Sequence, residues 1–181
     1  MILLDVDGVL AGSHKALIEL LRNRGHDVSL DDITDWDFGR LKDKTGYSGK
    51  KCVELFWELW RNFPNTILPL DDTAVHTANH ILEKYESEIV TANPTPTIRD
   101  WLLRVGISTN YFRISDEKTE LEYTVLIEDN PTLRLNSHKL ILRDQPWNQN
   151  LSGVTRFYQT AELIPILDNL LHQGIVNYRR L

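Results

Sequence analysis

Residues 2–9 read Ile-Leu-Leu-Asp-Val-Asp-Gly-Val, and this stretch decides how the rest of the chain is interpreted. The apolar run predicts a buried strand that delivers Asp5 and Asp7 to its C-terminal end, with both side chains pointing the same way. Two carboxylates held this close are unfavourable unless a cation joins them or one carries a proton. Gly8 then lets the chain turn sharply. The pattern predicts a place to hold Mg²⁺ and attack a phosphate; the alternative is a strand that ends in a plain Asp-Gly turn.

Composition narrows the class of protein. A chain of 181 residues with 41% hydrophobic and 25% charged residues is long enough to bury a core of its own. The net charge of -6 argues against binding a long nucleic acid, but it suits a small anionic substrate bound through a metal. Cys52 is the only cysteine, so no internal disulfide can form. Since no apolar stretch fits a membrane span or a secretory signal, we expect a cytoplasmic protein with no membrane partner. The sequence leaves open whether it forms a homodimer.

Strand-like and helix-like segments alternate over most of the chain. Predicted strands cover residues 1–5, 88–91, 111–114, 123–127 and 140–142. Predicted helices cover residues 13–25, with Ser13 as the N-cap, and then residues 71–85, 94–106 and 160–172. This order predicts an α/β fold with a Rossmann-like parallel sheet and helices on both faces. In such folds the ligand lies beyond the C-terminal ends of the strands.

Residues 27–68 depart from this alternation and hold most of the aromatic side chains. Within them, Val53, Phe56, Trp57 and Trp60 recur at helical spacing, which predicts one apolar helix face. Polar turn signals surround this helix. We therefore interpret the segment as a small helical insertion after the first strand rather than as part of the sheet.

Polar residues follow the other predicted strands as well. Thr91 ends the second strand, Glu128 and Asp129 follow the fourth, and Lys118 lies in the connection before it. Taken singly, each has an ordinary interpretation: a strand-end cap, a turn and a solvated lysine. Because the carboxyl ends of parallel strands share one sheet edge, we expect these side chains to gather around one point.

The expected set suits phosphoryl transfer from a monoester. Asp5 would attack phosphorus and form an aspartyl-phosphate, and Asp7 would act as general acid and then as base. Mg²⁺ would be held by Asp5, the Asp7 main-chain carbonyl and Asp129, with Glu128 holding one of its waters. Lys118 would neutralise charge, and the Thr91 hydroxyl would bind phosphate oxygens.

The order of these motifs resembles the haloacid dehalogenase (HAD) superfamily of phosphohydrolases. It covers residues 1 to about 143: Asp-Val-Asp-Gly-Val, a hydrophobic run ending in Thr91, then Lys118, then Ile-Glu-Asp. The resemblance implies Asp5 as nucleophile, Asp7 as acid/base, Thr91 and Lys118 as phosphate binders, and Glu128 with Asp129 as the acidic metal motif. It also implies a catalytic core, residues 1–13 and 71–181, and a helical cap, residues 14–70.

Within the superfamily the chain looks most like the 5'(3')-deoxyribonucleotidases. The similarity rests on Asp-Gly-Val-Leu-Ala after the first strand, a Trp- and Phe-rich cap, and Asp-Gln-Pro-Trp-Asn at residues 144–148. The chain departs from that pattern at Ala92, where serine is usual, and at Glu128, where aspartate is usual. The resemblance implies a nucleoside monophosphate as the small phosphorylated substrate.

Aromatic side chains of the insertion are candidates for stacking on a base. Trp36 and Phe38 lie in a polar loop, where a large exposed aromatic needs a reason, and Trp57 lies on the aromatic helix face. Ala92 and Asn93 directly follow the phosphate-binding strand. These five are the predicted substrate-binding residues, although most aromatics of the insertion are expected to form its core.

Three other functions stay open. One is a sugar-phosphate or phosphoglycolate phosphatase, or a phosphomutase, of the same superfamily. Another is a catalytically silent binding protein on the same fold, which the intact acidic residues disfavour. The third is a signalling receiver domain, which would place its phosphoacceptor on the third strand and has no room for the insertion at residues 27–68.

Overall fold

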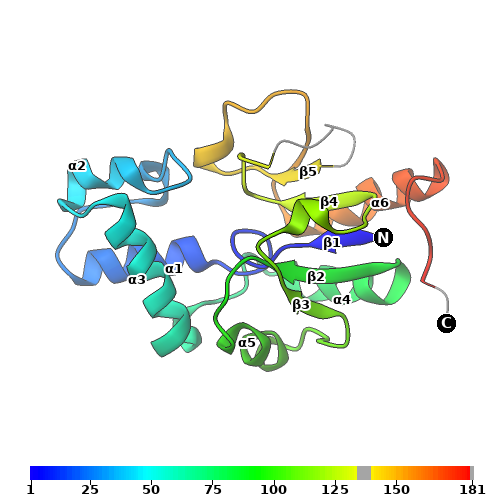
Figure 1. The fold of residues 1–181 in the computed structure, drawn as a ribbon, viewed down its shortest axis with the longest axis horizontal. Helices are drawn as coiled ribbons and strands as arrows, with labels where there is room; N and C mark the ends of the chain where they lie inside the picture. Colours follow the sequence, from blue (N-terminus) through cyan, green and yellow to red (C-terminus); the bar gives the residue numbers. More distant parts are fainter. Residues whose placement is uncertain (134–139, 180–181) are drawn as a thin grey trace.

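The computed structural model describes residues 1–133 and 140–179, so residues 134–139 and 180–181 of the predicted core lie outside the described residues. A parallel sheet forms the centre of the protein (Figure 1). Its strands are β1 (Ile2–Leu4), β2 (Ser87–Thr91), β3 (Phe112–Ile114), β4 (Val125–Glu128), β5 (Leu140–Arg143) and β6 (Thr155–Phe157). The predicted α/β fold is confirmed. The sequence missed β6, because only one of its three residues is buried and it carries no readable apolar pattern.

The strand order is β3-β2-β1-β4-β5-β6. The chain builds the sheet from β1 outward to β3, then returns to β4 and continues outward to β6. The direction of winding therefore reverses between β1 and β4, which is where ligands bind in open parallel sheets. Leu4 at the end of β1 lies opposite Ile127 of β4 and Ile89 of β2. The segments that follow β1 and β4 thus leave the sheet side by side.

The two faces of the sheet are covered differently. The α-helices that pack on it are α4 (Ala74–Lys84), α5 (Thr97–Val105) and α6 (Leu163–His172). Their buried residues share one core cluster with Leu4, Ile127 and the strand residues on the same face. The opposite face, which includes Leu3 and Leu126, packs against partly buried residues of connecting segments. Within the described residues, α-helices therefore cover one face and connections with short 3-10 turns cover the other. For these residues the prediction of helices on both faces is wrong, because the second face is covered by apolar side chains of the connecting segments.

A helical lobe lies beyond the C-terminal ends of the strands (Figure 1). It contains α1 (Ser13–Asn23), α2 (Lys42–Thr45) and α3 (Gly49–Asn62), with the short 3-10 helices η1 (Leu30–Asp32), η2 (Gly39–Leu41) and η3 (Pro64–Thr66). The other 3-10 helices of the described residues are η4 (Lys118–Glu120), η6 (Pro146–Asn148) and η7 (Thr160–Glu162). We call residues 14–70 the cap. Every helix within residues 1–133 and 140–179 is too short or too polar to span a lipid bilayer.

The chain enters and leaves the cap through two segments that lie side by side. The N–H of Gly12 donates to the carbonyl of Leu68 (2.9 Å), and the N–H of Leu70 donates to the carbonyl of Leu10 (2.7 Å). Gly12 is also the N-cap of α1, with no side-chain hydrogen bond. The predicted capping role of Ser13 is therefore wrong, because the helix begins at Ser13 and the residue before it is the cap.

Candidate active site

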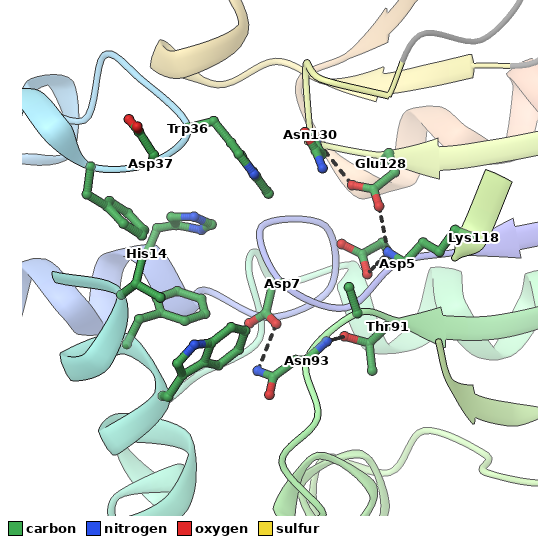
Figure 2. A pocket seen from close by; sticks show the side chains of 15 residues that line it. Asp5, Asp7, His14, Trp36, Asp37, Thr91, Asn93, Lys118, Glu128 and Asn130 are labelled. Atoms are coloured by element: carbon green, nitrogen blue, oxygen red, sulfur yellow. Dashed lines mark hydrogen bonds and ion pairs between the residues drawn. The ribbon is translucent and has the colours of Figure 1, made fainter. Parts of the chain in front are cut away.

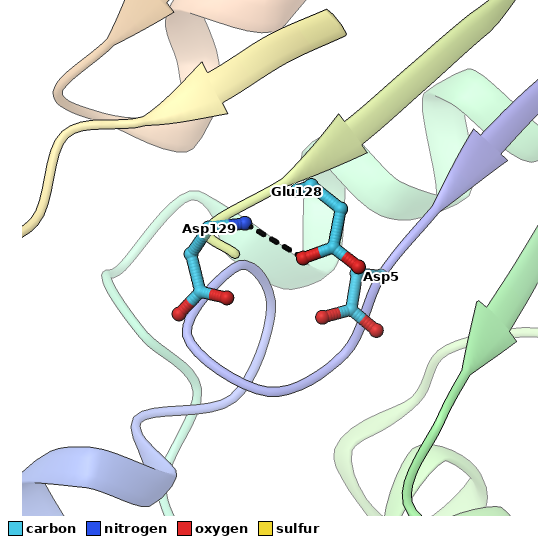
Figure 3. A group of neighbouring side chains, drawn as sticks. All are labelled: Asp5, Glu128 and Asp129. Atoms are coloured by element: carbon cyan, nitrogen blue, oxygen red, sulfur yellow. Dashed lines mark hydrogen bonds between the residues drawn. The ribbon is translucent and has the colours of Figure 1, made fainter. Parts of the chain in front are cut away.

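Three carboxylates meet where β1 and β4 end. Asp5, Glu128 and Asp129 each offer an oxygen, and these oxygens lie within 4.8 Å of one another (Figure 3). All three side chains are buried. The N–H of Asp5 donates to the carbonyl of Ile127 (3.0 Å), which keeps Asp5 level with the end of β4. Acidic residues from two distant stretches of the sequence therefore form one cluster.

Lys118 inserts its ammonium group into this cluster. The residue begins η4, in the connection between β3 and β4, and it is buried. Its Nζ lies 2.5 Å from Asp5 Oδ1 and 2.5 Å from Glu128 Oε1 (Figure 2). The second oxygen of Glu128 accepts the backbone N–H groups of Asp129 (2.9 Å) and Asn130 (3.1 Å). Donors therefore occupy both oxygens of Glu128.

Burial makes the negative charges of the cluster unfavourable. It raises the pKa of Asp5 well above the ordinary value, Glu128 adds to the rise, and Lys118 offsets it only in part. Burial likewise raises the pKa of Asp129, and the charges of Glu128 and Asp5 raise it further. Burial alone would lower the pKa of Lys118, but Asp5 and Glu128 raise it above its usual range, so the ammonium stays charged. One ammonium thus faces three buried carboxylates.

The cluster fits a divalent cation. The carboxylate oxygens of Asp129 are both buried, and no described residue donates a hydrogen bond to them. Because buried polar groups are almost always satisfied, this carboxyl group requires a cation or a proton, and a cation would satisfy both of its oxygens. Gly8 keeps the space beside it open: its φ is +72°, and a Cβ there would lie 1.7 Å from Asp129 Oδ2. Oxygen donors of this kind suit Mg²⁺, with Asp5 and Asp129 as its side-chain ligands.

Asp7 has a different set of partners. Its Oδ1 accepts the indole N–H of Trp60 (2.8 Å), and its Oδ2 accepts the side-chain amide of Asn93 (3.0 Å). Burial raises the pKa of Asp7, and the hydrogen bonds it accepts, those from Asn93 and Trp60 included, lower it in part. Its side chain stands outside the group of three carboxylates. Of the predicted contacts of Asp7 with the metal, only the one through its main-chain carbonyl therefore remains.

The segment after β2 supplies neutral polar groups. Thr91 is buried at the end of the strand, and its Oγ1 accepts the backbone N–H of Asn93 (3.1 Å). The Thr91 hydroxyl thus caps the turn with its oxygen and keeps its own proton to donate. Asn93 has both ends of its amide in use, since its Oδ1 accepts the N–H of Thr95 (3.0 Å) while its Nδ2 holds Asp7. Asn93 therefore holds Asp7 in place. Ala92, which lies between Thr91 and Asn93, is exposed.

A cavity of about 270 Å³ joins the cluster to the cap, near the small end of the range for ligand pockets (Figure 2). All nine predicted catalytic and substrate-binding residues line it: Asp5, Asp7, Trp36, Phe38, Trp57, Thr91, Ala92, Asn93 and Lys118. Glu128 lines it as well. Asp129 is fully buried.

The aromatic residues of the cap form one wall of this cavity. Trp36 and Trp57 are half-buried, which leaves part of each ring accessible. Phe38 differs from the expectation of an exposed ring: it is 5% exposed, because it packs against Phe56 with ring centres 5.9 Å apart. Its φ of +59° is a left-handed conformation that is unfavourable for phenylalanine. Packing of the Phe38 ring therefore holds the loop that carries Trp36 in a backbone conformation that is unfavourable by itself.

His14 is a site residue that the sequence analysis missed. It lies in the first turn of α1, lines the cavity, and stacks on Trp147 with ring centres 4.2 Å apart. Burial lowers its pKa to about 3, so its imidazole is neutral. Its Nδ1 lies 4.0 Å from Asp129 Oδ2. Its position in the first turn of the helix that follows the Asp-Gly stretch is a signal that could have identified it.

The segment at residues 145–148 holds the backbone of both acidic loops. The carbonyl of Asp129 accepts the indole N–H of Trp147 (3.2 Å) and the side-chain amide of Asn148 (3.0 Å). The amide of Gln145 donates to the carbonyl of Gly8 (3.0 Å). In the sequence this segment is distinguished only by its resemblance, and the structure gives it a physical role.

Comparisons with known proteins agree on the fold. No protein-family model and no curated protein sequence matches the chain. A HAD family hydrolase from Deinococcus radiodurans, solved with bound phosphate and sodium, aligns with a TM-score of 0.59 at 16% identity, covering 97% of this chain and 96% of its own. A predicted phosphatase from Clostridium acetobutylicum aligns with a TM-score of 0.56 at 12% identity, covering 92% and 97%. A β-phosphoglucomutase from Clostridium difficile aligns with a TM-score of 0.50 at 13% identity, covering 96% and 97%.

The chain has the fold of the HAD family hydrolases. At these identities the likeness concerns the fold alone, and a fold by itself does not set a function. The chemistry of this protein therefore depends on the residues at its site.

Replacing Gly8 with alanine tests the space beside Asp129. Gly46 has nearly the same backbone conformation, with a φ of +73°, but no atom lies within 4 Å of where its Cβ would be. Gly46→Ala should therefore cost only the left-handed strain, about 1–2 kcal/mol of unfolding free energy. Gly8→Ala should cost clearly more, because its Cβ also collides with Asp129. Urea unfolding of both variants makes the comparison, and equal losses would contradict it.

Thermal unfolding with and without Mg²⁺ tests the metal site. Mg²⁺ at 100 times its Kd should stabilise the wild-type protein by about 2.7 kcal/mol. Asp129→Asn should abolish this response and should melt at a higher temperature than the wild type in EDTA, because it removes an uncompensated buried charge. Asp72→Asn, an exposed carboxylate, is the matched control and should respond like the wild type. A normal Mg²⁺ response of Asp129→Asn would remove Asp129 from the site.

Proposed function

We propose that the protein is a phosphatase of the HAD superfamily that hydrolyses phosphoric monoesters through an aspartyl-phosphate on Asp5. The observation that carries this proposal is the Lys118 ammonium, which contacts Asp5 and Glu128 at once beside the orphaned carboxylate of Asp129. A site that must bind a phosphate next to a carboxylate nucleophile needs this local positive charge.

Each residue has a defined part in the two steps. Asp5 attacks phosphorus, the bond to the leaving oxygen breaks, and that oxygen takes the proton of Asp7. Asp7 then takes a proton from water, whose oxygen attacks phosphorus and releases phosphate and free Asp5. A bound Mg²⁺, held by Asp5, Asp129 and the Asp7 carbonyl, would supply charge that neutralises the phosphate. The Thr91 hydroxyl proton and the Lys118 ammonium bind phosphate oxygens.

The cavity favours a flat substrate group, and we propose nucleoside monophosphates as the substrate class. The cap side of the cavity consists of aromatic rings and the apolar side chain of Val53, with Asp37 as the one charged residue among those described. Stacking on such rings contributes about 1–3 kcal/mol per base. A sugar would need several hydrogen-bonding partners there instead.

A phosphosugar is the second candidate substrate. The fold likeness to a β-phosphoglucomutase and the pair Glu128–Asp129 in place of two aspartates favour it. A panel of deoxynucleoside monophosphates and small phosphosugars separates the two candidates. Fast turnover of phosphosugars with no turnover of nucleotides would reverse our order.

Substituting the nucleophile tests the proposed chemistry. Asp5→Asn should lower the hydrolysis of p-nitrophenyl phosphate by at least about 10³-fold, because an amide cannot form the acyl phosphate. Its melting temperature should not fall, since it removes a buried charge. Asp116→Asn, an exposed carboxylate near Lys118, is the control and should keep wild-type rates. Wild-type activity in Asp5→Asn would show that the nucleophile is assigned wrongly.

Trp36→Ala tests the base-binding wall. The loss of stacking should raise KM for a nucleoside monophosphate by about 5- to 150-fold, which corresponds to 1–3 kcal/mol, and leave KM for p-nitrophenyl phosphate nearly unchanged. Phe63→Ala removes an aromatic ring of the cap that is 46% exposed and does not line the cavity. This control should leave both constants unchanged. An equal rise of KM for the two substrates would remove Trp36 from the base site.

A further inference from the structure

Trp60 connects the cap to Asp7. It lies near the end of α3, its side chain is fully buried, and its indole N–H donates to Asp7 Oδ1 at 2.8 Å. The other oxygen of Asp7 is held by Asn93 from the core. The carboxylate proposed as acid and base is therefore fixed by one donor from each part of the protein.

Trp60 differs in this respect from its neighbour Trp101. The two rings meet edge to face, with centres 5.7 Å apart, and both side chains are buried. The indole N–H of Trp101 donates to the main-chain carbonyl of Ile67 (2.7 Å), the kind of partner that satisfies a structural tryptophan. Trp60 donates to a carboxylate instead, and a hydrogen bond to a charged acceptor is roughly twice as strong as one between neutral groups.

The contact depends on how α3 sits against the core. The hydroxyl of Thr97, the first residue of α5, donates to the main-chain carbonyl of Trp60 (2.6 Å). This bond fixes the backbone at the position that delivers the indole to Asp7. Movement of α3 away from α5 would break both bonds together and leave Asn93 as the donor that holds the Asp7 side chain.

We propose that Trp60 is a positioning residue for the acid/base: its indole N–H holds Asp7 Oδ1, so that the carboxyl group keeps one orientation while it exchanges a proton with the leaving oxygen and with water. A protonated carboxyl can still accept the indole N–H on its unprotonated oxygen, so Trp60 holds Asp7 in both steps. Asp7 is then competent only while α3 is seated on the core. This inference rests on the proposed phosphatase function.

Two aryl phosphates of similar shape test the inference. p-Nitrophenolate leaves with little help from an acid, whereas phenolate needs a proton from Asp7. In Trp60→Phe, the single-turnover phosphorylation rate with phenyl phosphate should fall about tenfold or more, part of the 10²–10⁴ that general acid catalysis supplies. The rate with p-nitrophenyl phosphate should fall much less. Because release of phosphate still needs Asp7 as base, a burst of p-nitrophenol should appear in this variant.

Trp101→Phe is the matched control. It removes a neighbouring indole N–H from the same buried cluster. Its melting temperature should therefore fall by a similar amount, but the phosphorylation rates with the two substrates should change by the same factor. Where Trp60→Phe proves too unstable, 3-benzothienylalanine at position 60 keeps the shape of the side chain and lacks only the N–H. Equal rate losses on both substrates, or the same selective loss in Trp101→Phe, would overturn the inference alone. No hydrolysis of either ester by the wild-type protein would overturn the proposed function as well.

Discussion

The arrangement of the site is set by an excess of buried negative charge at one edge of the sheet. Asp5, Glu128 and Asp129 have oxygens within 4.8 Å of one another, and Lys118 is the one cation that the described residues bring to them. Every neighbouring feature reduces the cost of this charge. Backbone N–H groups bind Glu128, Gly8 keeps side-chain atoms away from Asp129, and the orphaned oxygens of Asp129 leave a place for a divalent cation.

Parallel topology makes this concentration of charge possible. β1 and β4 are neighbours although the whole cap and two further strands separate them in the chain. Because the winding reverses between them, the loops after both strands diverge and leave a crevice at the sheet edge. The segment at residues 145–148, which follows β5, closes the crevice from one side by binding the carbonyls of Gly8 and Asp129. The cap covers it from the other, so charge comes from the core and apolar surface from the cap.

Local sequence patterns predicted the features that depend on short-range rules. The apolar runs gave five of the six strands, and the aromatic spacing of residues 53–60 gave α3. Side-chain partners depend on long-range packing and escaped prediction. Trp60 was placed on an aromatic helix face whose members were expected mostly to form the core, since a spacing shows where a ring is buried but not that its N–H reaches Asp7. His14 was missed, and Phe38 was expected to be exposed, because the rings that cover them come from distant segments.

The position of α3 suggests how substrate recognition and chemistry are coupled. Trp57 lines the cavity, and one helical turn later Trp60 holds Asp7. A base stacked on Trp57 would contact the same helix that holds Asp7, and so would favour the position of α3 in which Trp60 reaches Asp7. Binding energy from a part of the substrate that does not react would then help to position the acid at the part that does, which raises kcat rather than only lowering KM. A substrate without a flat group would bind the same phosphate site and lose this contribution.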